Sequence, residues 1–233
     1  MPKIKICGLF RQEDISYVNE ARPDYAGFVF AKSRRQVTAS QAARLRSGLG
    51  EGIVPVGVFV NAPVQDIAAL YREGVIAAVQ LHGSEDKDYI RRLKDVCEAP
   101  AIKAVSVRNR EDLLPWAAGS GADFLLLDHG AGGTGERFNW QLVLGDNPAD
   151  GTRPGSGQDT AGCTAGCTAF SLPYFIAGGI TVHNITEALS LKPDGPKPYG
   201  IDVSSGAETG GVKDRDKILK LVELVRRNGG LAE

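Results

Sequence analysis

The stretch VPVGVFVNAPVQDIAALYREGVIAAVQLHG, residues 54–83, contains the unit from which the chain is built. An apolar run at 54–60 is followed by a segment at 63–74 whose apolar residues recur every three or four positions, and then by a second apolar run at 77–81. The runs are typical of buried strands, and the segment between them is typical of an amphipathic helix. The stretch therefore predicts two parallel strands joined by a helix.

The same unit recurs along the chain. Strand-like runs occur at 3–7, 25–30, 54–60, 77–81, 101–105, 123–128, 173–178 and 199–203. Segments with helical spacing occur at 13–21, 40–47, 63–74, 86–97, 110–119, 183–191 and 213–227. With the short run at 139–144 as the remaining helix, eight strand–helix units in 233 residues predict an α/β fold, a single-domain (β/α)8 TIM barrel over residues 1–233. A doubly wound open sheet is the alternative, but the glycine-rich dinucleotide turn that usually follows its first strand is missing from the sequence.

The sixth and seventh strand-like runs start 50 residues apart, whereas most others start 22 to 29 residues apart. The excess falls at 146–171, a segment rich in Gly, Thr, Ala and Ser that includes the tandem TAGCTAGCTA. Such a composition buries little apolar surface, so we expect a flexible insertion near the sixth helix, for which the short run at 139–144 remains. A loop without function is the simpler interpretation of it, and a substrate lid is the alternative.

Composition narrows the classes of function. The formal net charge of −1 argues against a general nucleic-acid binder, which needs a basic surface. The sequence contains no secretory signal and no apolar run of about eighteen residues, so we expect a cytoplasmic protein without a membrane segment. Four cysteines are too few for a disulfide scaffold, and Cys163 and Cys167 have no histidine nearby, so we expect no metal site.

Polar residues and glycines gather where the predicted strands end, which is where barrels of this kind carry their active sites. They are Cys7, Gly8, Ser33, Arg34, Arg35, Asn61, Gln80, His82, Gly83, Asp128, Gly178, Gly179, Asp202, Ser204, Ser205 and Gly206. Because glycine lets backbone N–H groups approach an anion, the glycines after the seventh and eighth strands predict a phosphate cradle. The GAGGTG run at 130–135 lacks the Lys-Ser/Thr ending of a P-loop and predicts a loop over the site rather than ATP binding.

Strand periodicity predicts what points into the barrel. Ile4 and Ile6 share one face and suit packing against helices, whereas Lys5 and Cys7 share the inward face. Asp202 would face inward from the eighth strand, which neighbours the first in a closed barrel. We therefore expect a buried Lys5–Asp202 pair beneath Cys7, whose cation would lower the pKa of the thiol and favour thiolate.

These residues carry a family resemblance. The motifs, in chain order, are KICGL (5–9), GFVFAKSRR (27–35), VGVFVN (56–61), VQLHG (79–83), LLLD (125–128) followed by GGTGERFNW (132–140), IAGGI (176–180) and GIDVSSGAE (200–208). Together they resemble phosphoribosylanthranilate isomerase over about residues 3–227, the insertion excepted. The resemblance implies an aldose–ketose isomerase, an intramolecular oxidoreductase of tryptophan biosynthesis. It would convert N-(5-phosphoribosyl)anthranilate to 1-(2-carboxyphenylamino)-1-deoxyribulose 5-phosphate by a cofactor-free Amadori rearrangement.

The resemblance also implies roles for individual residues. Cys7 matches the general base of the family and Asp128 its general acid. Arg35 matches the arginine that binds the anthranilate carboxylate, with Arg34 as the alternative because one residue is missing before KSRR compared with some members. The phosphate would be held by Gly178, Gly179, Ser204 and Ser205. We expect Asp202 to belong to the substrate site, and His82 either contacts substrate or only donates a hydrogen bond at the rim.

Two other functions compete with this one. The isomerase of histidine biosynthesis performs the same rearrangement in the same fold, but it has an aspartate where Cys7 stands. A non-catalytic barrel that only binds a sugar phosphate is the second alternative, and the joint presence of Cys7, Asp128 and Arg35 argues against it. The expected partner is the small phosphosugar–anthranilate substrate, and the chain would be a monomer or a homodimer.

Overall fold

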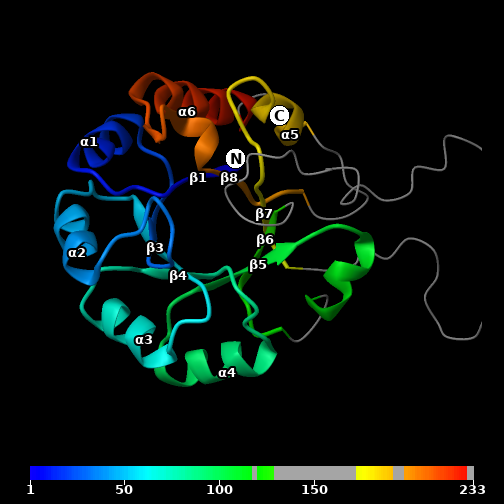
Figure 1. Cartoon of the computed structure of the whole chain (residues 1–233). Helices are drawn as coiled ribbons and strands as arrows, with labels where there is room; N and C mark the ends of the chain where they lie inside the picture. Colours follow the sequence, from blue (N-terminus) through cyan, green and yellow to red (C-terminus); the bar gives the residue numbers. More distant parts are fainter. Residues whose placement is uncertain (117–119, 129–171, 191–196, 230–233) are drawn as a thin grey trace, which may run out of the picture.

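Eight parallel strands form a closed barrel in the computed structural model of the chain (Figure 1). The structure describes residues 1–116, 120–128, 172–190 and 197–229. The expected insertion at 146–171, the short helix at 139–144, the glycine-rich loop at 130–135 and the cysteines 163 and 167 lie outside the described residues.

The barrel strands follow one another in sequence order, and the eighth pairs with the first. They are β1 (Lys3–Cys7), β2 (Tyr25–Val29), β3 (Val54–Phe59), β4 (Ala78–Leu81), β5 (Ala101–Ser106), β6 (Phe124–Asp128), β7 (Tyr174–Ile176) and β8 (Gly200–Val203). The closed order confirms the predicted barrel and rules out the open sheet. None of the helices in the described ranges is long and apolar enough to span a membrane.

Helices surround the barrel (Figure 1). They are α1 (Gln12–Ala21), α2 (Ala39–Ser47), α3 (Val64–Arg72), α4 (Lys87–Val96), α5 (Ile185–Leu189) and α6 (Arg215–Gly229). The helix predicted at 110–119 is instead the 3-10 helix η1 (Arg110–Trp116), which contains Pro115. Proline lacks the N–H that an α-helix would need there, and its ring disturbs the preceding turn, which accounts for the difference.

The chain after β8 departs further from the prediction. The segment after Ser204 forms a three-residue 3-10 helix, η4 (Ser205–Ala207). It leads into an unpredicted antiparallel hairpin of β9 (Glu208–Thr209) and β10 (Val212–Lys213). Gly210 and Gly211 form the hairpin turn with φ of +60° and +85°, values that glycine adopts without steric cost.

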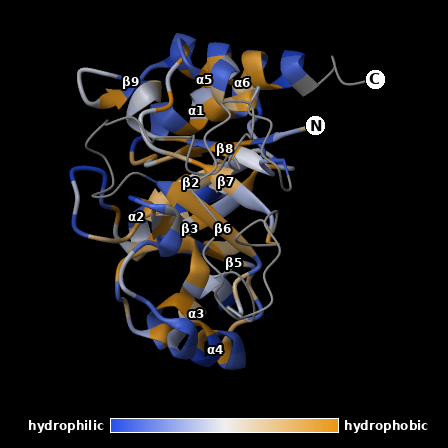
Figure 2. Cartoon of the chain, turned by 90° about the vertical axis from the view of Figure 1, so that its right-hand side faces the viewer, coloured by the Kyte–Doolittle hydropathy of each residue, from blue (hydrophilic) through white to orange (hydrophobic). Residues whose placement is uncertain are grey.

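Apolar side chains form two layers. In Figure 2 much of the orange, hydrophobic colour lies on the barrel strands, whereas the helices carry both orange and blue stretches. Ile4 and Ile6 belong to the layer between barrel and helices, as the strand periodicity predicted. The inner layer fills the barrel and contains Val56, Ile102 and Leu126. The two layers hold the strands rigidly, so that their carboxyl ends become a fixed platform for side chains.

An aromatic cluster fills the end of the barrel where the strands begin. Phe175 lies in the middle of it, 5.5 Å from Tyr25, 6.0 Å from Phe124 and 5.3 Å from Tyr199 between ring centroids. The hydroxyl groups of Tyr25 and Tyr199 hydrogen-bond to each other at 2.9 Å. This end is therefore closed by packing, and polar chemistry is confined to the opposite end.

We expect Phe175→Ala to destabilise the fold by about 3–5 kcal/mol, because it leaves a cavity among buried rings. Denaturant unfolding measures this change. Leu114→Ala is the control, since Leu114 is 60% exposed and its loss should change the free energy of unfolding by less than about 0.5 kcal/mol. Equal effects of the two substitutions would contradict the proposed role of the cluster.

Candidate active site

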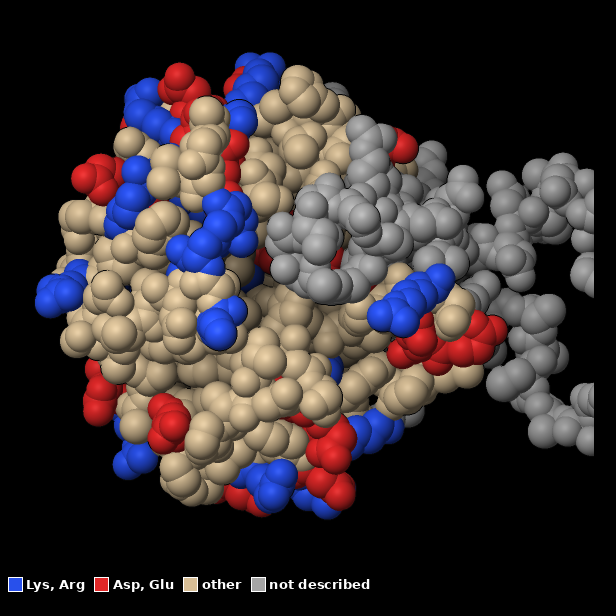
Figure 3. Space-filling view, viewed as in Figure 1, with Lys and Arg blue, Asp and Glu red and all other residues tan. Residues whose placement is uncertain are grey.

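A pocket opens at the carboxyl ends of the strands, in the hollowed centre of the face in Figure 3. All nine residues that the sequence predicted for the site line it: Cys7, Arg35, His82, Asp128, Gly178, Gly179, Asp202, Ser204 and Ser205. They come from β1, β6, β8 and the loops after β2, β4, β7 and β8. Residues distant in sequence are thus brought to one cavity, as parallel strand ends in a barrel require.

Two glycines make room around the end of β1, where Cys7 is the last residue: Gly27 for the Cys7 sulfur and Gly8 for the Arg35 side chain. Gly27 lies opposite Cys7 on β2, and a side-chain Cβ there would lie 2.7 Å from the Cys7 sulfur. Gly8 turns the chain with φ of +81°, and a Cβ there would lie 2.4 Å from Cδ of Arg35. The role of Gly27 was missed in the sequence, because its partner strand and register were needed to see it.

The predicted ion pair beneath Cys7 is confirmed. Lys5 lies opposite Asp202 in the β1–β8 ladder, and Lys5 Nζ is 2.8 Å from Asp202 Oδ1. Burial alone would lower the pKa of Lys5, but the charge of Asp202 and the nearby Cys7 outweigh burial and raise it. Lys5 is therefore a permanent buried cation one pleat below the thiol.

The expected direction of the Cys7 pKa is wrong. Burial raises the pKa of the Cys7 thiol, and this effect exceeds the lowering by the charges of Lys5 and Lys213, while Asp202 raises the pKa further. The sequence revealed the cation but not the depth at which the sulfur lies. Lys5 limits the rise and does not reverse it, so the thiol is the resting form of Cys7 at neutral pH.

Asp128 and His82 lie together in the same pocket. Asp128 ends β6, and its Oδ2 lies 3.7 Å from Nε2 of His82, which follows β4. Burial lowers the pKa of His82 and outweighs the attraction of Asp128 and Asp202, so the imidazole is neutral at pH 7. The Gln80 side-chain amide lies 2.8 Å from His82 Nδ1. A donating amide there would place the ring proton on Nε2, the nitrogen nearer Asp128.

The loops after β7 and β8, where the sequence predicts a phosphate cradle, lie against each other. Gly178 and Gly179 both have positive φ, +82° and +63°. A Cβ at Gly206 would lie 1.8 Å from the Ile180 carbonyl oxygen, so only glycine allows this approach. The Ser204 hydroxyl donates to the Cys7 carbonyl at 3.2 Å, which joins the β8 loop to the end of β1.

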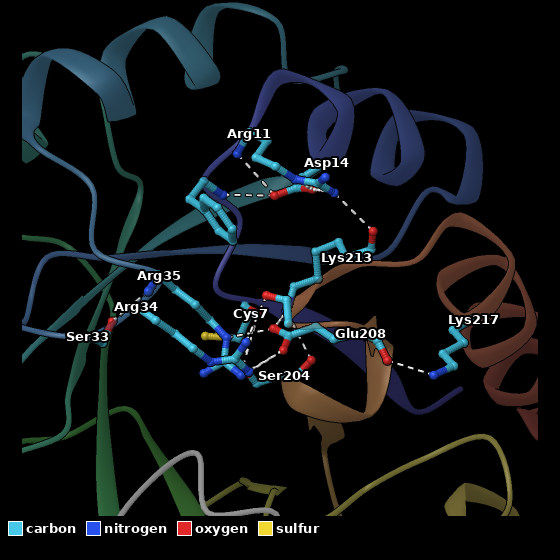
Figure 4. Close-up of polar contacts among 12 residues, drawn as sticks. Cys7, Arg11, Asp14, Ser33, Arg34, Arg35, Ser204, Glu208, Lys213 and Lys217 are labelled. Atoms are coloured by element: carbon cyan, nitrogen blue, oxygen red, sulfur yellow. Dashed lines mark hydrogen bonds and ion pairs between the residues drawn. The ribbon is translucent and has the colours of Figure 1, made fainter.

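Arg35 and Arg34 have different surroundings. Arg35 is buried and lines the pocket. The Arg34 side chain is half-exposed and is not among the described residues that line the pocket. It donates a hydrogen bond to the Gly211 carbonyl at 2.8 Å. Both arginines run toward Glu208 (Figure 4). Of these two arginines, the geometry favours Arg35 as the one that faces the pocket, which Lys32 also lines.

Glu208 was not among the predicted site residues. Its carboxylate accepts from Arg34, from Arg35 Nε at 2.6 Å and from Lys213 Nζ at 2.7 Å. Burial would raise the pKa of Glu208, but hydrogen bonds and charges of Arg35 and Lys213 lower it to about 2. Glu208 ends the family motif GIDVSSGAE (200–208), which is the one signal that could have singled it out. The motif does not reveal that the hairpin carries Glu208 to Arg35.

Comparison with known proteins identifies the family. The family model described as N-(5'phosphoribosyl)anthranilate (PRA) isomerase matches residues 4–224. The chain belongs to this family.

Individual members are similar over nearly their whole length. The N-(5'-phosphoribosyl)anthranilate isomerase of Endomicrobium trichonymphae is 42% identical over 230 residues, which cover 97% of this chain and 99% of the relative. The crystal structure of phosphoribosyl anthranilate isomerase from Thermotoga maritima superimposes with a TM-score of 0.76 at 29% identity, covering 97% of this chain and all of the other. A phosphoribosyl anthranilate isomerase in complex with reduced 1-(o-carboxyphenylamino)-1-deoxyribulose 5-phosphate has a TM-score of 0.73 at 29% identity over the same shares.

Lys5→Met should raise the pKa of the Cys7 thiol further, because it removes the largest lowering effect and leaves Asp202 beside the sulfur. The pH dependence of Cys7 alkylation by iodoacetamide, followed by mass spectrometry of the Cys7 peptide, measures this shift. Lys3→Met is the matched control, since Lys3 lies on the same strand and pairs with Asp24 at the surface. An unchanged inflection in folded Lys5→Met would show that the cation does not act on the thiol.

Proposed function

We propose that the chain converts N-(5-phosphoribosyl)anthranilate to 1-(2-carboxyphenylamino)-1-deoxyribulose 5-phosphate, with Cys7 as general base and Asp128 as general acid. The observation that supports these roles best is the single pocket that holds both residues together with Arg35 and the glycine-bearing loops. The reaction is an internal oxidoreduction, since sugar carbon 1 is reduced and carbon 2 is oxidised. It therefore needs no external electron acceptor.

The two anionic ends of the substrate would fix the sugar between them. Backbone N–H groups at Gly178 and Gly179, with Ser204 and Ser205, suit a phosphate, which prefers closely spaced donors. The Arg35 guanidinium suits the planar aromatic carboxylate. Holding both ends orients the sugar before reaction and removes much of the entropic part of the barrier.

Ring opening comes first. Asp128 would deliver a proton to the furanose oxygen as the bond between that oxygen and carbon 1 breaks, while the nitrogen lone pair turns the existing nitrogen–carbon 1 bond into a double bond, which gives an iminium ion. A neutral His82 beside Asp128 does not add a second positive charge to the site at this stage. Proton delivery by a positioned carboxyl group is ordinary general acid catalysis.

Cys7 acts in the second step. Its thiolate would remove the proton from carbon 2, and the electron pair would move through carbon 1 to the iminium nitrogen. The resulting enolamine becomes the product ketone when carbon 1 gains a proton and the hydroxyl group on carbon 2 loses its proton. The iminium charge formed in the first step lies in the same pocket and favours ionisation of the thiol, which offsets the effect of burial on the Cys7 pKa.

The remaining expectations belong to the same proposal. We propose that the chain is one barrel domain, works in the cytoplasm and serves tryptophan biosynthesis as a monomer or homodimer. A solved relative from Thermotoga maritima, 30% identical to this chain, is described as a dimeric phosphoribosylanthranilate isomerase from which monomers were generated.

Cys7→Ala and Asp128→Asn should each lower turnover of freshly prepared N-(5-phosphoribosyl)anthranilate by about 10²–10⁴-fold, because each removes a proton-transfer group. The loss of substrate fluorescence measures turnover. Cys97→Ala is the control, since Cys97 is buried on the helix side of the fold and should leave turnover unchanged. Near-normal turnover by Cys7→Ala would mean that another group is the base, and no turnover by the wild type would favour the non-catalytic alternative.

A further inference from the structure

We propose that Glu208 is a positioning residue that holds Arg35 in the orientation in which it binds the aromatic carboxylate of the substrate. This inference rests on the proposed function and deepens it. Glu208 would not touch the substrate itself. It would act through Arg35.

The contacts between the two residues leave one edge of the guanidinium available. Arg35 donates from Nε to Glu208 Oε1 at 2.6 Å and from Nη2 to Oε2 at 3.0 Å, which is a two-point grip. Two parallel bonds fix both the position and the plane of a guanidinium. Arg35 Nη1 has no hydrogen-bond partner within the described part of the chain, and the Arg35 side chain lines the pocket.

Burial makes this grip specific to Glu208. Both side chains are more than nine-tenths buried, and the stem of Arg35 passes over Gly8, where a Cβ would collide with it. The guanidinium therefore has little room to find another partner. An arginine in such a place is oriented by its surroundings, whereas an exposed arginine samples many directions.

Glu208 also connects the carboxylate grip to the rest of the site. Lys213 donates to Glu208 Oε1 at 2.7 Å and to the Ser204 carbonyl at 3.0 Å (Figure 4). The Ser204 hydroxyl in turn donates to the Cys7 carbonyl. One carboxylate thus sets the spacing between Arg35, the β8 loop and the base.

The direction in which removal of the Glu208 charge changes carboxylate binding distinguishes a positioning role from a purely electrostatic role. Arg34, Arg35 and Lys213 surround Glu208, so four charges leave a net charge of about +2 at this wall. Removing the negative charge raises the positive potential and would by itself strengthen carboxylate binding. If Glu208 works by positioning, the freed cations repel each other, Arg35 leaves its orientation, and carboxylate binding weakens.

The experiment measures the affinity of the wild type and of each variant for two ligands. One is the reduced product, which carries the aromatic carboxylate, and the other is its anilino counterpart without that carboxylate. The wild type should prefer the first. Glu208→Gln should lose about tenfold or more of this preference, with the affinity for the anilino ligand unchanged within about twofold. The loss should appear in KM for the substrate more than in kcat.

Matched variants keep the comparison interpretable. Arg34→Gln removes a cation from the same carboxylate but leaves the two-point grip, so it should keep the ligand preference. Glu208→Asp keeps the charge and should retain part of the preference. Glu20→Gln removes an exposed carboxylate that pairs with Arg215, and it should change the affinity for neither ligand. Arg35→Gln should abolish the preference, and adding Glu208→Gln to it should have no further effect.

Several results would overturn the inference. Tighter binding of the carboxylated ligand by Glu208→Gln would show that Glu208 only reduces the local charge, and an equal loss for both ligands would show a structural role. If Glu208→Gln does not fold, Arg35→Lys decides, because it keeps the charge but cannot make the two-point grip and must also lose the preference. Wild-type turnover is measured separately, so failure of the proposed function is distinguishable from failure of this inference.

Discussion

The buried ion pair between Lys5 and Asp202 is the interaction on which the site depends. It crosses the seam where β8 meets β1, and so it stands where the barrel closes. A buried pair of this kind contributes little net stability, because desolvation of both charges offsets their attraction. The ion pair matters instead because it fixes the register of β1 against β8 and places a cation directly beneath the sulfur of Cys7.

The charged groups divide the pocket into two unlike sides. Around β1, β2 and β8 the cations of Lys5, Arg35 and Lys213 each have a buried carboxylate partner. At the ends of β4 and β6, the carboxyl group of Asp128 and a neutral imidazole face the cavity instead. The cationic side suits anion binding and proton abstraction, and the other side suits proton delivery. The fold thereby separates the two halves of an isomerisation that must add a proton at one atom and remove one at another.

Much of this arrangement was predictable from the sequence. The alternation of apolar runs and helical segments predicted the barrel, and period-two patterning predicted that Ile4 and Ile6 face the helices while Lys5 and Cys7 face inward. The position of Asp202 on the eighth strand then predicted the ion pair. These inferences succeeded because strand periodicity and barrel closure leave few alternatives.

The features that sequence reasoning missed depend on depth and on non-local contacts. The direction of the Cys7 pKa follows from how far the sulfur is buried, which no local pattern reveals. The β9–β10 hairpin has strands of two residues each, too short to leave a periodic signal. In the sequence, Glu208 is a loop carboxylate at the end of a motif, and only the folded hairpin shows its contact with Arg35. Gly27 is likewise one glycine within a strand, and its role requires knowing that Cys7 lies opposite it.

The proposed mechanism requires that Cys7 and Asp128 face the same sugar. A crystal structure of this chain with the reduced reaction product bound tests that arrangement most directly. We predict the sulfur of Cys7 within about 3.5 Å of sugar carbon 2 and a carboxyl oxygen of Asp128 on the opposite side of the sugar chain. A product whose carbon 2 lies out of reach of the sulfur, with its phosphate away from Gly178 and Gly179, would contradict the account.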